Sequence, residues 1–409
     1  MDFGVTQEQQ DFVRDAAEFL DKEFFSKLEH EQVDPFSFHY DDTYLRRLDE
    51  ELGYTEKLFN KGLRGVSWPV AYGGAGRSSI EQWLYSEELV YRRLPPGGHS
   101  VSSVGATIMR FGTDEQKKRF LRAIQQGRME LALGYTEPNA GTDLGSIETR
   151  AVREGDSYVV NGQKIYTTAA HYATHIWLAA RTGTVASREM GLSVFVVPLD
   201  SPGISVRPLY TQVDLRSNEV FLDSVRISAR DRIGNENEGW PVMRMALDLE
   251  MLRPYSGLRH DLDDLIEWTR IAQGPGGIPL IEDPVVRQTL ARLVVDLEVA
   301  RLLLMRTVWV ASVSGATDGP PKVEAAMAKV WLSELQRRVA SEGLALMGAQ
   351  GQLKIASEGA PAGGRLEKLF RYCPVYIFGS GSNEILRDVI AQAGLRLPPT
   401  RTAEGEPWI

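Results

Sequence analysis

Residues 135–143 read YTEPNAGTD and mark the point where the character of the chain changes. Glu137 precedes a proline, which pushes its backbone toward an extended conformation, and the Asn-Ala-Gly-Thr-Asp run then turns the chain. Such a loop can present backbone N–H groups and hydroxyls to a polar ring or a carbonyl. On these residues alone an ordinary surface turn is the more frequent structure, and we assign no chemistry to Glu137.

Downstream of this loop, alternation of apolar and polar residues predicts β-strands. Residues 158–166, YVVNGQKIY, place Asn161-Gly162 between two alternating runs, which predicts a β-hairpin. Tyr166 and Thr168 would then share one face of its second strand. Further strands are predicted over 176–180, 192–197 and 219–222, so a compact β unit ends near residue 230.

Helical periodicity dominates on both sides of the β unit. Helices are predicted over 11–20 and 80–91, with Glu87 and Glu88 on the polar side of the second, and the Pro- and Gly-rich run at 68–76 predicts a loop. Two apolar stripes in the C-terminal part predict core helices. They are Leu290, Leu293, Val294, Leu297, Ala300 and Leu304, and then Val323, Met327, Val330, Trp331 and Leu335.

The chain therefore runs α, then β, then α. We predict an all-α domain over 1–130, a β domain over 131–238, a helical domain over 239–397 and a loose tail over 398–409. Within the helical domain, the QGPGG run at 273–277 predicts a turn.

Composition and charge exclude several classes of protein. The net charge of −9 argues against a nucleic-acid or anionic-membrane binder, which needs a positive field. The single cysteine, Cys373, allows no disulfide framework and fits a reducing compartment. Neither a signal peptide nor a membrane-spanning run is visible, so a cytoplasmic location is expected.

Motifs for several common enzyme classes are also missing. The sequence has neither a Gly-rich dinucleotide loop nor a phosphate-binding P-loop nor a Gly-x-Ser-x-Gly elbow. His171 and His175 are four residues apart, but in a segment predicted to run from loop into strand, so we expect no metal site.

Several collinear motifs together resemble the acyl-CoA dehydrogenase family. They are the 135–143 loop, the NGQKIYTT run at 161–168, YGG-x-G at 72–76, NEVF at 218–221, EGW at 238–240 and GSNEILR at 381–387. The resemblance covers nearly the whole chain. It implies an α+β fold with an N-terminal helical domain, a middle β domain and a C-terminal four-helix bundle.

The resemblance also implies FAD as cofactor and an acyl-CoA thioester as substrate. In the family, the loop carrying Tyr135 and Thr136 and the strand carrying Tyr166 and Thr168 hold the isoalloxazine ring. Tyr166 stands where a Trp usually shields the flavin face. Further carried-over positions are Thr142, a small hydroxyl residue beside flavin and substrate, and Ser382, at the cofactor.

The catalytic base is implied by the same resemblance. Many members carry a Glu just before the Gly of the C-terminal motif, but Ser380 stands there in this chain. A minority place the base on a helix in a Leu-Asp-Leu-Glu pattern, which here gives Glu250 as the base, with Asp248 and Ser380 at the substrate. Glu250 would remove the α proton while the β hydride passes to flavin N5.

One departure from the family concerns the adenine side of FAD. In homotetrameric members, a neighbouring subunit holds it through Arg-x-x-Phe-Gly and Gln-x-x-Gly-Gly segments. The corresponding regions here read QGPGG at 273–277 and ALMGA at 345–349, without the Arg, Phe and Gln. We therefore expect a heterotetramer with a paralogous subunit, of the kind that often acts on steroid side-chain thioesters, with electron-transfer flavoprotein as acceptor.

Three alternatives remain. The first is a homo-oligomeric dehydrogenase with an altered FAD clamp. The second is a non-catalytic paralogue that completes a partner's flavin site, which Glu250 and the flavin-ring motifs disfavour. The third is other flavin chemistry, such as acyl-carrier-protein or nitroalkane oxidation, although the nitroalkane enzymes carry an Asp at the position of Ser380.

Overall fold

The computed structural model describes residues 4–28, 48–313, 321–355 and 357–398. By its contacts the chain forms two compact units. One comprises residues 7–85 and 94–250, and the other comprises 1–6, 86–93 and 251–409. We call them the sheet unit and the bundle unit. The predicted tail, apart from residue 398, lies outside the described residues.

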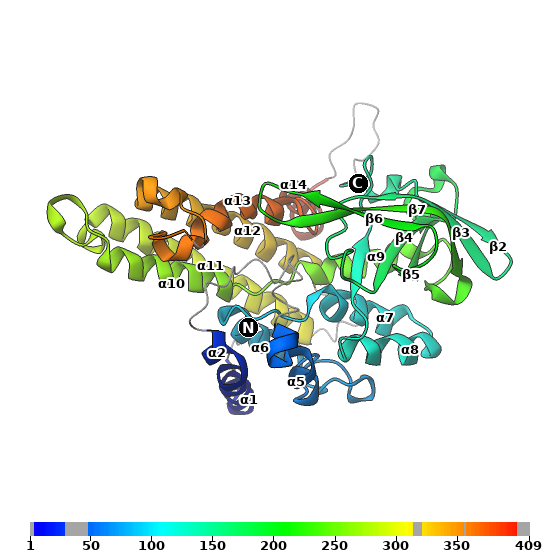
Figure 1. Cartoon of the computed structure of the whole chain (residues 1–409), viewed down its shortest axis with the longest axis horizontal. Coiled ribbons are helices and arrows are strands. Elements are labelled where there is room, and N and C mark those ends of the chain that lie inside the picture. The colour runs from blue at the N-terminus through cyan, green and yellow to red at the C-terminus, as the bar shows by residue number, and fades with distance from the viewer. Residues whose placement is uncertain (1–3, 29–47, 314–320, 356, 399–409) are drawn as a thin grey trace. The chain divides into compact units, whose positions relative to one another are not determined.

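The sheet unit is built on one eight-stranded mixed sheet (Figure 1). The strands follow the order β6-β7-β3-β2-β4-β5-β8, and β1 pairs with β4 in parallel. The predicted strands at 176–180, 192–197 and 219–222 are confirmed as parts of β4, β5 and β7. The bounds are β1 Leu131–Gly134, β2 Arg150–Glu154, β3 Ser157–Lys164, β4 His175–Arg181, β5 Leu192–Pro198, β6 Ile204–Tyr210, β7 Arg216–Ser228 and β8 Arg232–Ile233.

The hairpin predicted at Asn161-Gly162 is wrong. Both residues lie inside β3, where the register against β7 shifts between Val160 and Gly162. A Cβ on Gly162 would lie 2.4 Å from Thr149 Oγ1 and 2.7 Å from Thr149 Cα, so glycine is required for close approach of the backbone. The hairpin turn instead comes at Gly155, where β2 and β3 pair in antiparallel register.

Helices of the N-terminal part pack in the sheet unit, together with α9 (Gly239–Glu250), but residues 86–91 of α6 belong to the bundle unit. The predicted helices at 11–20 and 80–91 are confirmed as α1 and α6, and the predicted loop at 68–76 contains only a short 3-10 turn at Val70–Tyr72. The bounds are α1 Gln7–Leu20, η1 Asp21–Phe25, α2 Ser26–Leu28, α5 Tyr54–Asn60, α6 Ser79–Tyr91, η3 Ser100–Val104, α7 Gly105–Phe111 and α8 Asp114–Gln125.

A capping box joins α8 to the sheet. The Thr113 side chain accepts from the Gln116 N–H, and the Gln116 side chain accepts from the Thr113 N–H. The Gln116 amide also donates to the carbonyls of Arg230 and Arg232, both at 2.8 Å. The core between helices and sheet includes the fully buried side chains of Trp177, Leu121 and Val194, among others.

The bundle unit is helical. Helices α10, α11, α12 and α13 pack together, α12 contacting each of the other three, which confirms the expected four-helix bundle (Figure 1). A turn separates α10 from α11 at Pro275–Gly277, as predicted. The bounds are α10 Ser256–Ile271, α11 Pro284–Val313, α12 Lys322–Met347, α13 Arg365–Phe378 and α14 Asn383–Val389.

The predicted apolar stripes are partly right. On α11 five of the six residues are buried, whereas Val294 is 45% exposed. On α12 Leu335 is buried, but the other four predicted residues are half-buried, and Ala325, Ala326 and Leu332 are buried instead. The small side chain of alanine allows close helix packing. Alanine is only weakly hydrophobic, however, so buried alanines do not stand out as an apolar stripe in the sequence. No helix of the described residues is long and apolar enough to cross a membrane.

Glu87 is not on a polar surface, contrary to the prediction. It is buried in the bundle unit, and its carboxylate accepts hydrogen bonds from the backbone N–H groups of Tyr255 (3.2 Å) and Ser256 (2.9 Å) at the start of α10. The Ser256 hydroxyl donates to the Glu87 carbonyl at 2.6 Å. Burial raises the pKa of Glu87 to about 7, although these hydrogen bonds act in the opposite direction.

The raised pKa predicts a pH-dependent cost to stability. Between the ordinary value of 4.5 and about 7, the unfolded state releases the Glu87 proton before the folded state does, so this group lowers stability as pH rises. The two pKa values differ by about 2.5, which corresponds to about 3 kcal/mol. Glu87→Gln should therefore gain thermal stability relative to the wild type between pH 4.5 and 8, as measured by denaturation midpoints.

The control for this experiment is Glu267→Gln. Glu267 is exposed and pairs with Arg270 on α10, and its replacement should leave the pH profile of the midpoint close to that of the wild type. A difference between Glu87→Gln and wild type that stays constant with pH would contradict the prediction.

Candidate active site

A buried ion pair anchors the loop that follows β1. Lys164 Nζ lies 2.7 Å from Glu137 Oε1 and donates to the Tyr135 carbonyl at 3.1 Å. The N–H groups of Glu148 and Thr149 donate to the Glu137 carboxylate. Burial acts to raise the pKa of Glu137, but Lys164 and these hydrogen bonds outweigh burial and lower it. Glu137 thus holds the loop in place.

The segment after β3 departs from the predicted strand. β3 ends at Lys164, and Tyr166 has a φ of 55°. Tyr166 and Thr168 therefore lie in a turn, and the prediction that they share one face of a strand is wrong. A positive φ at a non-glycine residue is uncommon, and it persists only where surrounding contacts fix the backbone.

Hydrogen bonds from distant parts of the chain fix this turn. The Ile165 N–H donates to the Thr136 carbonyl at 2.9 Å, which places the two predicted flavin segments side by side. The Thr167 N–H donates to the Asn218 carbonyl at 2.9 Å, and the Asn218 amide donates to the Thr167 carbonyl at 3.0 Å. These contacts compete with continuation of the strand, and they set the direction of Tyr166.

The side chains of this turn and of the loop that carries Thr142 suit the binding of a flat heteroaromatic ring. The Tyr166 side chain is 60% exposed although it is aromatic. Thr168 follows in the same turn, with its hydroxyl 3.5 Å from the Ser217 hydroxyl. Thr142 is exposed just after a tight turn in which Glu137 and Ala140 exchange backbone hydrogen bonds. An exposed aromatic side chain and hydroxyl groups on two adjoining segments fit the isoalloxazine ring of a flavin.

Glu250 is the last residue of α9, also in the sheet unit. Its side chain is only 8% exposed, and its Oε1 lies 3.6 Å from His99 Nδ1. Tyr135 is close enough that the Glu250 charge acts on it, since burial first and then this charge raise the pKa of Tyr135. The Trp177 indole N–H donates to the Tyr135 hydroxyl at 2.7 Å. The structure therefore places Glu250 near the predicted flavin residue Tyr135.

Asp248 lies two residues before Glu250 on α9. Residues two apart on a helix do not share a face, and Asp248 Oδ2 lies 3.9 Å from Arg244 Nε on the same helix. The Asp248 side chain is 13% exposed. Its expected contact with substrate stays a prediction.

In the bundle unit, Ser380 lies in a strained turn before α14. Ser380 and Gly381 have φ values of 56° and 90°. Lys329 holds the turn, because its ammonium donates to the carbonyls of Gly381 (2.7 Å) and Ile377 (3.0 Å) and to Asn383 Oδ1 (2.8 Å). Burial and the charge of Arg253 lower the pKa of Lys329 to about 8.

Two further contacts define the surroundings of Ser380. The Arg253 guanidinium donates to the Ser380 hydroxyl at 3.3 Å and lies 4.9 Å from the centre of the Tyr376 ring. The Ser382 hydroxyl accepts from the Ile385 N–H and caps the N-terminus of α14. Ser382 therefore has a structural role, and its predicted contact with the cofactor stays a prediction.

Three family descriptions match successive parts of the chain. They are the acyl-CoA dehydrogenase N-terminal domain at residues 6–128, the middle domain at 132–225 and the C-terminal domain at 237–395. The chain belongs to the acyl-CoA dehydrogenase family. It is accordingly an oxidoreductase that acts on CH–CH bonds of acyl-CoA thioesters, in a flavin-dependent family.

Relatives with known names extend this likeness over most of the chain. Acyl-CoA dehydrogenase FadE26 of Mycobacterium tuberculosis is 36% identical over 357 residues, covering 84% of this chain and 88% of the relative. FadE29 of the same organism is 34% identical over 352 residues, covering 84% and 87%.

Solved structures share the fold of this chain. The Tcur3481-Tcur3483 steroid ACAD superposes with a TM-score of 0.84 at 32% identity, covering 98% of this chain and 100% of that one. The ChsE4-ChsE5 complex from Mycobacterium tuberculosis gives a TM-score of 0.83 at 32% identity, with coverage of 98% and 100%. The α+β fold and the family resemblance are confirmed.

Sequence reasoning missed His99 and Arg253. No local pattern marks either residue, because each acquires its contact from a segment distant in the chain. Among the residues that the structure describes, no group of three or more His, Cys, Asp or Glu side chains could hold a metal ion. His171 Nδ1 lies 3.1 Å from the side-chain nitrogen of Asn218.

Proposed function

We propose that this acyl-CoA dehydrogenase catalyses FAD-dependent α,β-desaturation of an acyl-CoA thioester, with Glu250 as the base that removes the α proton. The observation that carries the proposal is the position of the Glu250 carboxyl, 8% exposed at the end of α9 in the unit that also holds the Tyr166 turn. Burial shields the carboxyl from water, which favours proton abstraction from a weakly acidic carbon.

Other residues of the chain would bind the flavin and the substrate. Tyr135, Thr136, Tyr166 and Thr168 would hold the isoalloxazine ring, with Thr142 beside the flavin and the substrate. When bound, the flavin supplies a two-electron acceptor for the β hydride. A hydrogen bond from a backbone N–H to the thioester carbonyl would make the α proton acidic enough for a carboxylate to remove.

The function is tested by anaerobic mixing of the flavin-loaded enzyme with acyl-CoA thioesters. Loss of the oxidised-flavin absorbance, with formation of the 2-enoyl thioester detected by mass spectrometry, is the expected result. A steroid side-chain thioester is the first substrate to try, because a similar structure is described as a steroid ACAD. Absence of flavin reduction with straight-chain, branched and steroid thioesters alike would overturn the proposal.

The proposal includes a paralogous partner subunit. The segment at 273–277 forms a tight glycine turn in which the Gly274 N–H donates to the Ile278 carbonyl at 2.8 Å, and it carries no arginine that could hold a pyrophosphate. A similar structure is described as a complex of two different chains, ChsE4 and ChsE5. The electron acceptor in this scheme is electron-transfer flavoprotein, and the location is the cytoplasm.

Flavin content tests the partner. Purified alone in the presence of excess FAD, the folded chain should retain little flavin, because the adenine-side clamp is missing. Co-expression with a paralogue that carries the Arg-x-x-Phe-Gly and Gln-x-x-Gly-Gly segments should give near-stoichiometric flavin, counted by absorbance after denaturation. Circular dichroism establishes that the chain alone is folded. Near-stoichiometric flavin in the chain alone would overturn the heteromer.

A further inference from the structure

His99 faces the proposed base across 3.6 Å, from its Nδ1 to Glu250 Oε1. The two residues come from different segments, since His99 directly precedes the π-helical turn η3, and η3 packs against α9. π-Helical turns are rare in proteins, and those that occur often lie at functional sites. Nothing in the chemistry described so far uses this histidine.

The two side chains differ in their access to water. His99 is 43% exposed, whereas Glu250 is 8% exposed. A buried carboxyl that takes up the α proton must return it before the next turnover. Imidazole can accept a proton on one ring nitrogen and release one from the other, so a half-exposed histidine at this distance links the carboxyl to solvent.

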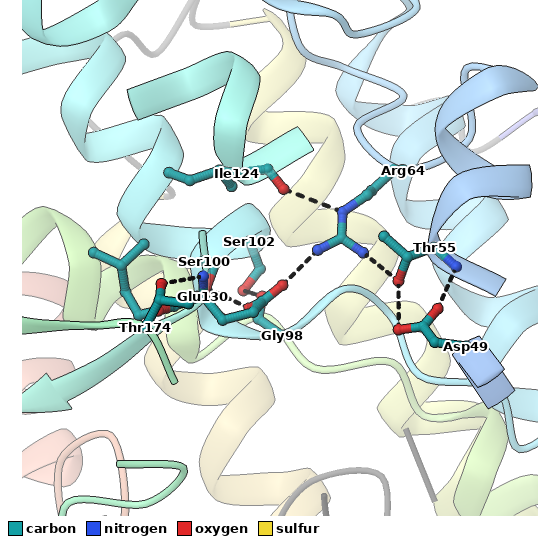
Figure 2. Close-up of polar contacts among 10 residues, drawn as sticks. Asp49, Thr55, Arg64, Gly98, Ser100, Ser102, Ile124, Glu130 and Thr174 are labelled. Atoms are coloured by element: carbon teal, nitrogen blue, oxygen red, sulfur yellow. Dashed lines mark hydrogen bonds and ion pairs between the residues drawn. The ribbon is translucent and has the colours of Figure 1, made fainter. Parts of the chain in front are cut away.

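A network of polar contacts holds the His99 segment in place (Figure 2). The Ser100 hydroxyl donates to Glu130 Oε2 at 2.6 Å and accepts from the Leu131 N–H at 2.9 Å. Arg64 Nη2 donates to the other Glu130 oxygen at 2.6 Å. Figure 2 shows Arg64, Glu130 and Ser100 in one network with Gly98, whose carbonyl accepts from the Ser102 hydroxyl at 2.9 Å.

The other titratable groups discussed for this region form other contacts or keep their proton at neutral pH. Glu130 is engaged by Arg64 and Ser100. Tyr135 is buried with a raised pKa, so its hydroxyl keeps its proton at neutral pH. Asp248 points toward Arg244 on its own helix.

We propose that His99 carries the proton from Glu250 to solvent, which rests on the proposed function of Glu250 as the base. The α C–H bond breaks and its proton joins the Glu250 carboxylate at Oε1. That proton passes to His99 Nδ1, and the imidazole releases a proton from Nε2 to water. Glu250 is left ionised for the next substrate, and no electrons move in these two transfers.

The test isolates proton removal from hydride transfer. An acyl-CoA analogue with sulfur in place of the β carbon cannot donate a hydride, but its α proton can still be removed and exchanged with deuterium from D2O, as followed by NMR. If the proton on Glu250 cannot reach solvent, it returns to the α carbon and no deuterium enters. The flavin-loaded enzyme is used with whatever partner subunit flavin loading requires.

In His99→Gln and His99→Ala, deuterium exchange should slow by about tenfold or more, since a positioned acid–base group typically contributes at least that much. Single-turnover flavin reduction by a true substrate should stay within about twofold of the wild type, because the first abstraction needs only Glu250. Added imidazole should restore exchange in His99→Ala. His175→Gln, the same replacement elsewhere in the sheet unit, should exchange like the wild type.

Each other result counts against the relay. Exchange at the wild-type rate in both His99 variants overturns it, as does failure of imidazole to restore exchange in His99→Ala. A parallel fall in exchange and in single-turnover reduction would make His99 a positioning residue instead. Glu250→Gln separates the two proposals, because exchange that survives in this variant sinks the base assignment, whatever the His99 variants show.

Discussion

Glu250→Gln is expected to lower turnover by roughly 10²- to 10⁴-fold, the usual contribution of a general base. Glutamine keeps the size of the side chain but cannot accept the α proton. Flavin content should stay close to that of the wild type, since the Tyr166 turn and the Thr136 loop are joined by their own backbone hydrogen bonds. The measurements are steady-state turnover with an acyl-CoA substrate and flavin absorbance per chain, both made on the flavin-loaded enzyme with whatever partner subunit flavin loading requires.

A matched control is Glu115→Gln, which makes the same change at an exposed position in the first turn of α8. It should retain wild-type turnover, so that loss of activity in Glu250→Gln reports on the site itself. A Glu250→Gln enzyme with undiminished turnover would sink the assignment of the base, and the catalytic carboxyl would then have to be sought elsewhere.

Lys164→Met is expected to destabilise the sheet unit by about 3–5 kcal/mol, the usual cost of removing one partner from a buried ion pair. Burial lowers the pKa of Lys164 to about 8, so the amine is charged at neutral pH and neutralises Glu137. Methionine fills a similar volume but leaves the Glu137 carboxylate without its counter-charge. Denaturant midpoints and flavin retention should both fall, because this pair ties the Tyr135 loop to the end of β3.

Two further variants sharpen this prediction. Lys164→Met combined with Glu137→Leu removes both charges and should recover part of the lost stability, because the desolvation cost of an ion pair goes with it. Arg226→Met breaks the Arg226–Glu154 pair, whose side chains are 67% and 52% exposed, and should cost less than about 1 kcal/mol. Equal midpoints for Lys164→Met and Arg226→Met would contradict the importance of the buried pair.

Local patterns predicted most elements correctly, since periodicity reports on which face of a helix or strand is buried. They failed where a distant segment changes the meaning of a residue. Asn161-Gly162 has the composition of a hairpin turn, but Gly162 is needed because Thr149 of a neighbouring segment approaches its backbone. Glu87 has the spacing of a surface residue, but it caps α10, which begins far along the chain.

The residues of the candidate site also fall into those that the sequence predicted and those that depend on contacts between distant segments. The motif around residues 247–252 and the family resemblance were sufficient to nominate Glu250, and the element order α, β, α followed from periodicity alone. The partners of Glu250 could not be nominated, because His99 lies about 150 residues away and no local pattern marks it. The same holds for Lys164 and Glu137, whose pairing depends on how the sheet brings two loops together.

The sequence by itself determined the family, the order of the elements and the candidate base, because these depend on local composition and on motifs of a few residues. The tertiary structure alone decided which charges are buried, the left-handed turn at Tyr166, and the histidine placed against Glu250. The physical reason is that burial and ion pairing arise from contacts between segments far apart in the chain. Such contacts leave no periodic trace in the residues that make them.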